Sequence, residues 1–171
     1  SQKFIPLAKP DIRESDIENV AKVLRSGMLV QGAEVQNLEN ELAKFLGAKH
    51  VICLSNGTAT LHTALLALDI KEGDEVIIPA LSYIATANVV ERVGATPIFV
   101  DVDERSFNID VTKIEAAITP RTKAIMPVHE FGLIAAIAKI KEIAESNDLY
   151  VIEDAACALG SSENGVMAGT T

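Results

Sequence analysis

Hydrophobic and polar positions follow two different rhythms along the chain. Up to residue 46, apolar residues recur at helical spacing, which predicts amphipathic helices over residues 11–25 and 33–46. From residue 51 onward, short apolar runs alternate with helical segments. The expected strands are 51–54, 75–78, 97–100, 123–128 and 149–152, and the expected helices are 61–68, 81–94, 112–118 and 134–146.

Repeated alternation of strand and helix predicts an α/β fold. Such patterns pack as parallel strands joined by right-handed helical crossovers. We therefore expect a three-layer α/β/α domain around a mainly parallel, mixed sheet, with a hairpin over residues 158–162 and 166–168. No internal repeat or low-complexity linker breaks the pattern, so residues 1–171 are expected to form one domain.

Composition narrows the possible function classes. Hydrophobic residues make up 49% of the chain, yet no apolar run is long enough to span a membrane and no signal segment opens the sequence. The net charge of −9, with scattered basic residues, argues against nucleic-acid binding. Cys53 and Cys157 are far apart, and neither they nor the three histidines have metal-type spacing. We expect a reducing, cytoplasmic location and no metal site.

A small polar segment, Ser-Asn-Gly-Thr-Ala-Thr at residues 55–60, lies between an expected strand and an expected helix. Free backbone N–H groups and the positive end of a helix bind phosphate at such junctions, and Gly57 would let the backbone approach closely. Neither a Walker loop nor a dinucleotide fingerprint is present. An ordinary helix cap explains the same residues, so this segment alone leaves both interpretations open.

Tyr83 and Asp154 each follow the carboxyl end of an expected strand, where open α/β sheets bind ligands. The ring of Tyr83 could stack on a planar ligand, or it could pack in the core. Asp154 could keep the ring nitrogen of a pyridine cofactor protonated, or it could end the strand or cap the next turn.

Taken together, these segments follow one another in a specific order over almost the whole chain. The segments that carry this order are residues 5–11, 26–32, 55–61, 73–79, 86–88, 99–103, 108–110, 119–125, 127–129, 131–132 and 152–156. Their order and spacing resemble the DegT/DnrJ/EryC1/StrS family, which are pyridoxal 5'-phosphate (PLP) dependent sugar aminotransferases of fold type I. The resemblance implies the large, PLP-binding domain of that fold over residues 1–171, incomplete at its C-terminal side and without the small C-terminal domain.

The resemblance also implies roles for individual residues. Gly57, Thr58 and Ala59 would hold the cofactor phosphate. Tyr83 would stack on the pyridine ring, and Asp154 would pair with its nitrogen.

Two further positions belong to the same implied site. Ala156 would pack on the opposite ring face, and Cys157 stands where the family more often has Gln or His near the 3-hydroxyl. A thiol is a poor hydrogen-bond partner, so that contact is open. No catalytic residue is assigned within this chain, because the Schiff-base lysine of the family is expected after Thr171.

The implied reaction moves an amino group from an amino acid, expected to be glutamate, to a nucleotide-linked keto sugar, in a homodimer. Without the lysine this chain alone is expected to be inactive. One alternative is a sugar dehydratase of the same family, with histidine replacing the lysine. Another is a non-catalytic regulatory protein on this fold. A nucleotide-binding doubly wound module is disfavoured, because the glycine fingerprint is missing.

Overall fold

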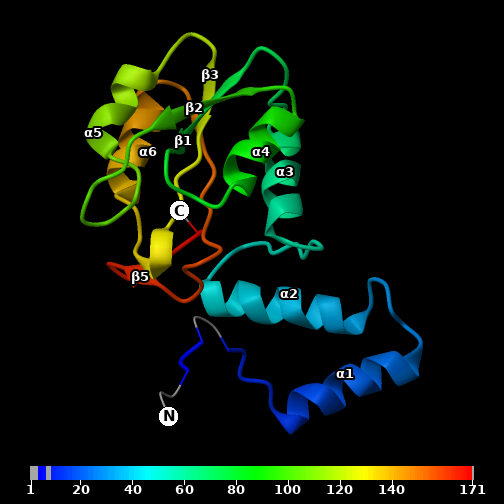
Figure 1. Ribbon diagram of the computed structural model, residues 1–171. Coiled ribbons are helices and arrows are strands. Elements are labelled where there is room, and N and C mark those ends of the chain that lie inside the picture. Colours follow the sequence, from blue (N-terminus) through cyan, green and yellow to red (C-terminus); the bar gives the residue numbers. More distant parts are fainter. Residues whose placement is uncertain (1–3, 7–8, 171) are drawn as a thin grey trace.

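A parallel sheet lies at the centre of the computed structural model, which describes residues 4–6 and 9–170 (Figure 1). Its four described strands lie in the order β2-β1-β3-β4. Their bounds are Glu75–Pro79 for β1, Thr96–Val100 for β2, Thr122–Ile125 for β3 and Tyr150–Val151 for β4. Each corresponds to an expected strand, although β3 and β4 are shorter than predicted.

Helices cover both faces of the sheet, which confirms the three layers (Figure 1). The first face carries α3 (Gly57–Ala67) and α4 (Ala85–Arg92), and the second carries α5 (Val111–Ile114) and α6 (Ile137–Ser146). Strand β1 is buried on both faces because its side chains alternate. Val76 and Ile78 pack into the first core, whereas Ile77 packs into the second.

Two N-terminal helices lie outside these three layers (Figure 1). Helices α1 (Glu14–Ser26) and α2 (Ala33–Leu46) confirm the two predicted amphipathic helices. Neither buries a residue, and α1 leaves an apolar face exposed through Ile17, Val20 and Leu24. In this structure their hydrophobic pattern therefore has little of the core contact that usually stabilises such helices.

The expected buried strand at residues 51–54 is wrong. The segment forms no helix or strand and pairs with no described strand, and Ile52 is 75% exposed. A strand requires a neighbour for its backbone hydrogen bonds. Here the Cys53 N–H instead donates to Glu39 Oε1 of α2 at 2.9 Å. An apolar run forms a buried strand only with a pairing partner, which the described residues do not supply here.

Five of the six predicted helices begin or end differently from the sequence prediction, and α1 and α3 begin at Glu14 and Gly57 instead of residues 11 and 61. Helix α4 starts at Ala85 rather than near residue 81, because the chain bends over residues 80–82 after β1 and turns at Ile84. The helix expected over 112–118 is a short α5 followed by the 3-10 helix η1 (Glu115–Ala117). Helix α6 starts at Ile137, after a second 3-10 turn, η2 (Glu130–Gly132).

A hairpin is present near the C-terminus as predicted, but its first strand is Ser162–Glu163 and not residues 158–162. Strand β5 (Ser162–Glu163) pairs antiparallel with β6 (Val166–Met167) in a separate described sheet. Asn164 and Gly165, with φ of 50° and 81°, form the two-residue turn between them, which favours these residue types. No helix among the described residues has the length and apolar character required to cross a bilayer.

Candidate functional site

Asp154 continues the parallel sheet beyond β4. Its N–H donates to the Pro127 carbonyl at 2.9 Å, and its own carbonyl accepts the His129 N–H at 3.0 Å. These bonds make a parallel β-bridge between Val128 and Asp154, so backbone hydrogen bonds hold Asp154 in place at the strand end. The side chain is half-buried, and its Oδ1 accepts the Ala156 N–H at 3.1 Å.

A buried His–Glu pair adjoins Asp154: Glu153 precedes it in the chain, and His129 bonds to its backbone. His129 is fully buried and its Nδ1 accepts the Ala135 N–H at 3.1 Å, so the ring proton resides on Nε2. That Nε2–H donates to Glu153 Oε2 at 2.9 Å, and the same oxygen accepts the Gly169 N–H at 3.1 Å. The pair thus ties the ends of β3 and β4 to the segment after the hairpin. Sequence reasoning considered His129 only as a metal ligand.

Tyr83 lies in the connection between β1 and α4, at the carboxyl end of β1. Its side chain is 77% exposed, so the alternative that Tyr83 packs in the core is wrong for the described structure. Its carbonyl accepts the Thr86 N–H at 3.0 Å, and the Ser82 and Thr86 hydroxyls bond at 2.8 Å. The turn is therefore held firmly while the ring faces outward.

The start of α3 contains the predicted small polar turn, with Asn56 as the capping residue, although no described strand precedes it. Asn56 Oδ1 accepts the Ala59 N–H at 2.9 Å, so that donor is already engaged. Gly57 and Thr58 are exposed, and as the first helical residues their N–H groups lack intrahelical acceptors. A Cβ at Gly57 would meet nothing within 4 Å. The helix start is open to an anion through two of the three expected residues.

Ala156 and Cys157 are both exposed in a turn that follows Asp154. The turn closes where Ala158 N–H donates to the Ala155 carbonyl at 2.9 Å. The Cys157 carbonyl lies 3.4 Å from the position of a Cβ on Gly132, so this turn packs closely against η2. Both predicted residues therefore lie at the same strand end as Asp154.

A second carboxyl group, that of Glu130, lies near Asp154 and escaped the sequence reasoning. The residue is 8% exposed, and its Oε1 has no hydrogen-bond partner among the described residues. Burial, followed by the charge of Asp154, raises the pKa of Glu130, while a hydrogen bond with the Ser82 side chain opposes the shift. The sequence alone shows only that Glu130 is an acidic residue after an apolar run. Its proximity to Asp154 depends on the order of the strands in the sheet.

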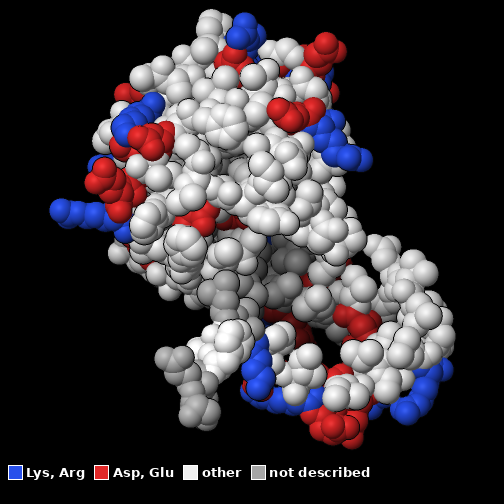
Figure 2. All heavy atoms as spheres, viewed as in Figure 1, with Lys and Arg blue, Asp and Glu red and all other residues white. Residues whose placement is uncertain are grey.

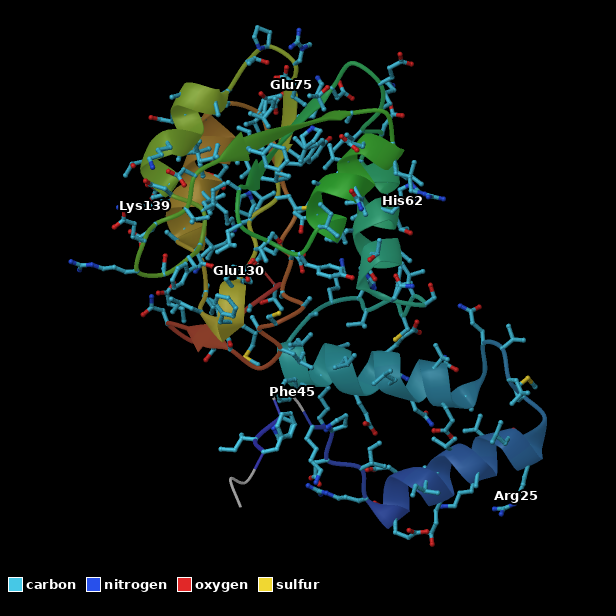
Figure 3. All side chains as sticks on the ribbon, in the orientation of Figure 1. Arg25, Phe45, His62, Glu75, Glu130 and Lys139 are labelled. Atoms are coloured by element: carbon cyan, nitrogen blue, oxygen red, sulfur yellow. The ribbon has the colours of Figure 1, made fainter. Side chains whose placement is uncertain are left out.

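Tyr83, Glu130 and Asp154 follow β1, β3 and β4 and lie at one end of the sheet, because these strands are parallel and share their carboxyl ends. Figure 3 shows Glu75, the first residue of β1, and Glu130 at opposite ends of the body. Figure 2 shows that the surface is hollowed between the body and the N-terminal helices. The described residues contain no cluster of three or more His, Cys, Asp or Glu that could hold a metal.

Known proteins with the same arrangement identify the family. A sequence model of the DegT/DnrJ/EryC1/StrS aminotransferase family matches residues 10–171. The chain belongs to this family. The spore coat polysaccharide biosynthesis protein SpsC of Bacillus subtilis is 44% identical over 167 residues, which covers 98% of this chain and 43% of SpsC. The GDP-perosamine synthase of Caulobacter vibrioides is 51% identical over 139 residues, covering 81% of this chain and 38% of the synthase.

Solved structures of the DegT/DnrJ/EryC1/StrS family share the fold. The PMP form of a putative sugar aminotransferase from Streptococcus pneumoniae superposes with a TM-score of 0.92 at 34% identity, covering 97% of this chain and 45% of that one. The chain thus spans less than half the length of these relatives.

Proposed function

We propose that this chain is the cofactor-binding part of a PLP-dependent sugar aminotransferase. The observation that carries the proposal is the backbone-fixed Asp154 after β4, at the same carboxyl end of the parallel sheet as the exposed ring of Tyr83 after β1. The open start of α3 adds free N–H groups for a phosphate. Relatives are consistent with it, since one is named UDP-4-amino-4-deoxy-L-arabinose--oxoglutarate aminotransferase and is 44% identical over 171 residues.

The residues present fit PLP by their donor chemistry. The N–H groups at Gly57 and Thr58 lack helical acceptors, and a helix start attracts a phosphate dianion. Tyr83 offers an exposed aromatic face, and Asp154 offers a half-buried acceptor at the strand end. When bound, PLP supplies a protonated pyridine ring that withdraws electrons from a carbanion.

Each side chain contributes one physical task in this proposal. The Asp154 carboxylate holds a proton at the ring nitrogen, which keeps the ring electron-poor. Tyr83 covers one face of the ring and excludes water there, and Ala156 packs on the other face. The N–H groups of Gly57 and Thr58 orient the phosphate, with Ala59 completing the first turn. Cys157 stands near the 3-hydroxyl as a weak partner.

The acid–base step requires a lysine that no residue of this chain matches in context. We propose that it lies beyond Thr171, and that glutamate donates the amino group to a nucleotide-linked keto sugar. The proposed enzyme is cytoplasmic and works as a homodimer. The exposed apolar face of α1 supports association, because isolated hydrophobic stripes of this kind usually bury against a partner.

The test uses the full-length protein that contains this chain, with PLP added. We expect a visible absorbance band for the lysine-bound cofactor, and its loss or marked weakening in Asp154→Ala. Asp11→Ala is the matched control, since that carboxylate lies on the exposed N-terminal segment. If Asp154→Ala leaves the spectrum unchanged, the role of Asp154 is wrong. Binding of the aminated cofactor without a lysine-linked band would instead favour the dehydratase alternative, and no binding would favour a regulatory protein.

A further inference from the structure

Glu130 is held inside the protein by its backbone. Its N–H donates to Asn108 Oδ1 at 2.9 Å, and Asn108 Nδ2 donates to the Leu133 carbonyl at 3.0 Å. Asn108 is itself buried, so it braces both ends of the η2 turn. The turn also contains Phe131 at φ 53°, a left-handed conformation that costs free energy and persists only where neighbours enforce it. Glu130 therefore has no easy route to solvent.

The acids around Asp154 differ in how their charge is compensated. Glu153 receives hydrogen bonds from the His129 Nε2–H and the Gly169 N–H. Glu130 is also buried, but its Oε1 has no described donor. The groups that set its ionisation are Asp154 from the end of β4, which repels a second charge, and Ser82 from the β1–α4 connection, which partly offsets that repulsion.

We propose that Glu130 is a second acid of the candidate cofactor site, which shares a single negative charge with Asp154 and holds the proton itself. The Asp154 side chain accepts a backbone N–H on Oδ1 and is in contact with solvent. Glu130, buried and short of donors, is the group that remains neutral. This inference rests on the proposed function only for its link to the cofactor.

The pair then responds to a bound ring. A protonated ring nitrogen neutralises Asp154, which removes the repulsion that keeps Glu130 protonated. Binding therefore lowers the pKa of Glu130 and releases a proton over the pH range between its pKa values in the free and bound states. Above that range the ionised Glu130 adds a second attraction for the cationic ring. A neutral residue at this position would lose that additional attraction.

The experiment compares full-length wild type with Glu130→Gln, using added pyridoxamine 5'-phosphate (PMP) as the probe because it binds without a Schiff base. Affinity is measured from mildly acidic to mildly alkaline pH. We expect equal affinity at the acidic end, and wild type to bind tighter by up to about tenfold for each pH unit by which the pKa falls on binding. Glu142→Gln, an exposed site on α6, is the matched control and should follow wild type throughout.

The free protein gives an independent readout. Because Glu130 has a raised pKa, it costs stability as pH rises through that value, so Glu130→Gln should gain melting temperature relative to wild type toward alkaline pH. Should Glu130→Gln fail to fold, calorimetry of wild type with PMP in two buffers of different ionisation enthalpy measures the released proton directly.

Each possible outcome has a distinct meaning. A ratio of affinities that stays flat with pH, or binding without proton release, overturns the sharing of charge. If wild type fails to bind PMP at all, the proposed function fails. The stability comparison then still decides whether Glu130 carries the proton, and a melting-temperature difference that is constant with pH would overturn that assignment.

Discussion

His129 donates from Nε2 to Glu153 Oε2 at 2.9 Å, and both side chains are almost completely buried. The ring accepts the Ala135 N–H on its other nitrogen, so its tautomer is set on both sides. A neutral imidazole thus links the end of β4 to the loop that leads into α6. This arrangement stiffens the backbone that presents the Asp154 carboxylate.

Removal of this imidazole should destabilise the protein. His129→Ala leaves the Ala135 N–H without its acceptor and Glu153 with one donor fewer, at a cost of about 3 kcal/mol in the free energy of unfolding. Urea denaturation measures the effect. Replacement of the exposed His50 by Ala is the control and should change stability by less than about 0.5 kcal/mol. Equal effects of the two substitutions would contradict this role for His129.

Stability should also depend on acid pH through Glu75. The Thr119 hydroxyl and, after the opposing effect of burial, Arg121 lower the pKa of this buried carboxyl. A lowered pKa contributes stability that is complete above the unfolded value of about 4 and is lost as pH falls through the folded value.

Glu75→Gln should accordingly cost about 2 kcal/mol near neutral pH, from the loss of charged hydrogen bonds. The cost should shrink as pH falls below about 4, where wild type loses the same contribution. Denaturation curves at several pH values measure this trend, with the exposed Glu115→Gln as the control. A cost that is independent of pH would show that the ionised carboxylate has no special role.

Gly57 and Gly94 should separate ligand binding from folding. A Cβ at Gly57 meets nothing within 4 Å, so Gly57→Ala should leave the free energy of unfolding within about 0.5 kcal/mol while it weakens binding of PMP by obstructing the phosphate. A Cβ at Gly94, with φ of +83°, would lie 3.2 Å from Glu72 Cβ. Gly94→Ala should therefore cost about 1–2 kcal/mol and leave PMP affinity unchanged. Loss of stability at Gly57 with unaltered affinity would contradict the phosphate assignment.

The exposed face of α1 predicts an effect on assembly. Leu24 is 60% exposed on that face, and Leu24→Lys places a charge there that an apolar interface would have to bury. We expect the proposed homodimer to dissociate at concentrations where wild type remains associated, as measured by sedimentation. Glu18→Lys is the control and should not change the assembly, because Glu18 is exposed on α1 outside the apolar face of Ile17, Val20 and Leu24.

Local pattern predicted those parts of the fold whose partners are close in sequence or implied by periodicity. Strand β1 was recognisable because a short, continuous apolar run is typical of a parallel strand that is buried on both faces. The segment at residues 51–54 carries a similar run, yet it lacks a strand partner among the described residues. Apolar pattern indicates what could be buried, but pairing depends on distant segments.

The sequence also predicted only part of the candidate site. Asp154 and Tyr83 follow strand ends, a position that sequence reveals directly. Glu130 and His129 act through neighbours brought together by strand order, which no local pattern contains. The exposure of Tyr83 likewise required the structure, because an aromatic residue after a strand is as compatible with a core position as with a surface one.

The unpaired segment at residues 51–54 has a practical consequence for the behaviour of the chain in solution. Its Cys53 N–H is bound to Glu39, but the segment has no β-ladder alongside it in the described structure. An exposed apolar segment whose backbone lacks strand partners can serve as a template for another strand. Expressed in isolation, the chain should therefore form aggregates that grow by backbone pairing at this segment, and a proline or lysine in place of the exposed Ile52 should improve its solubility.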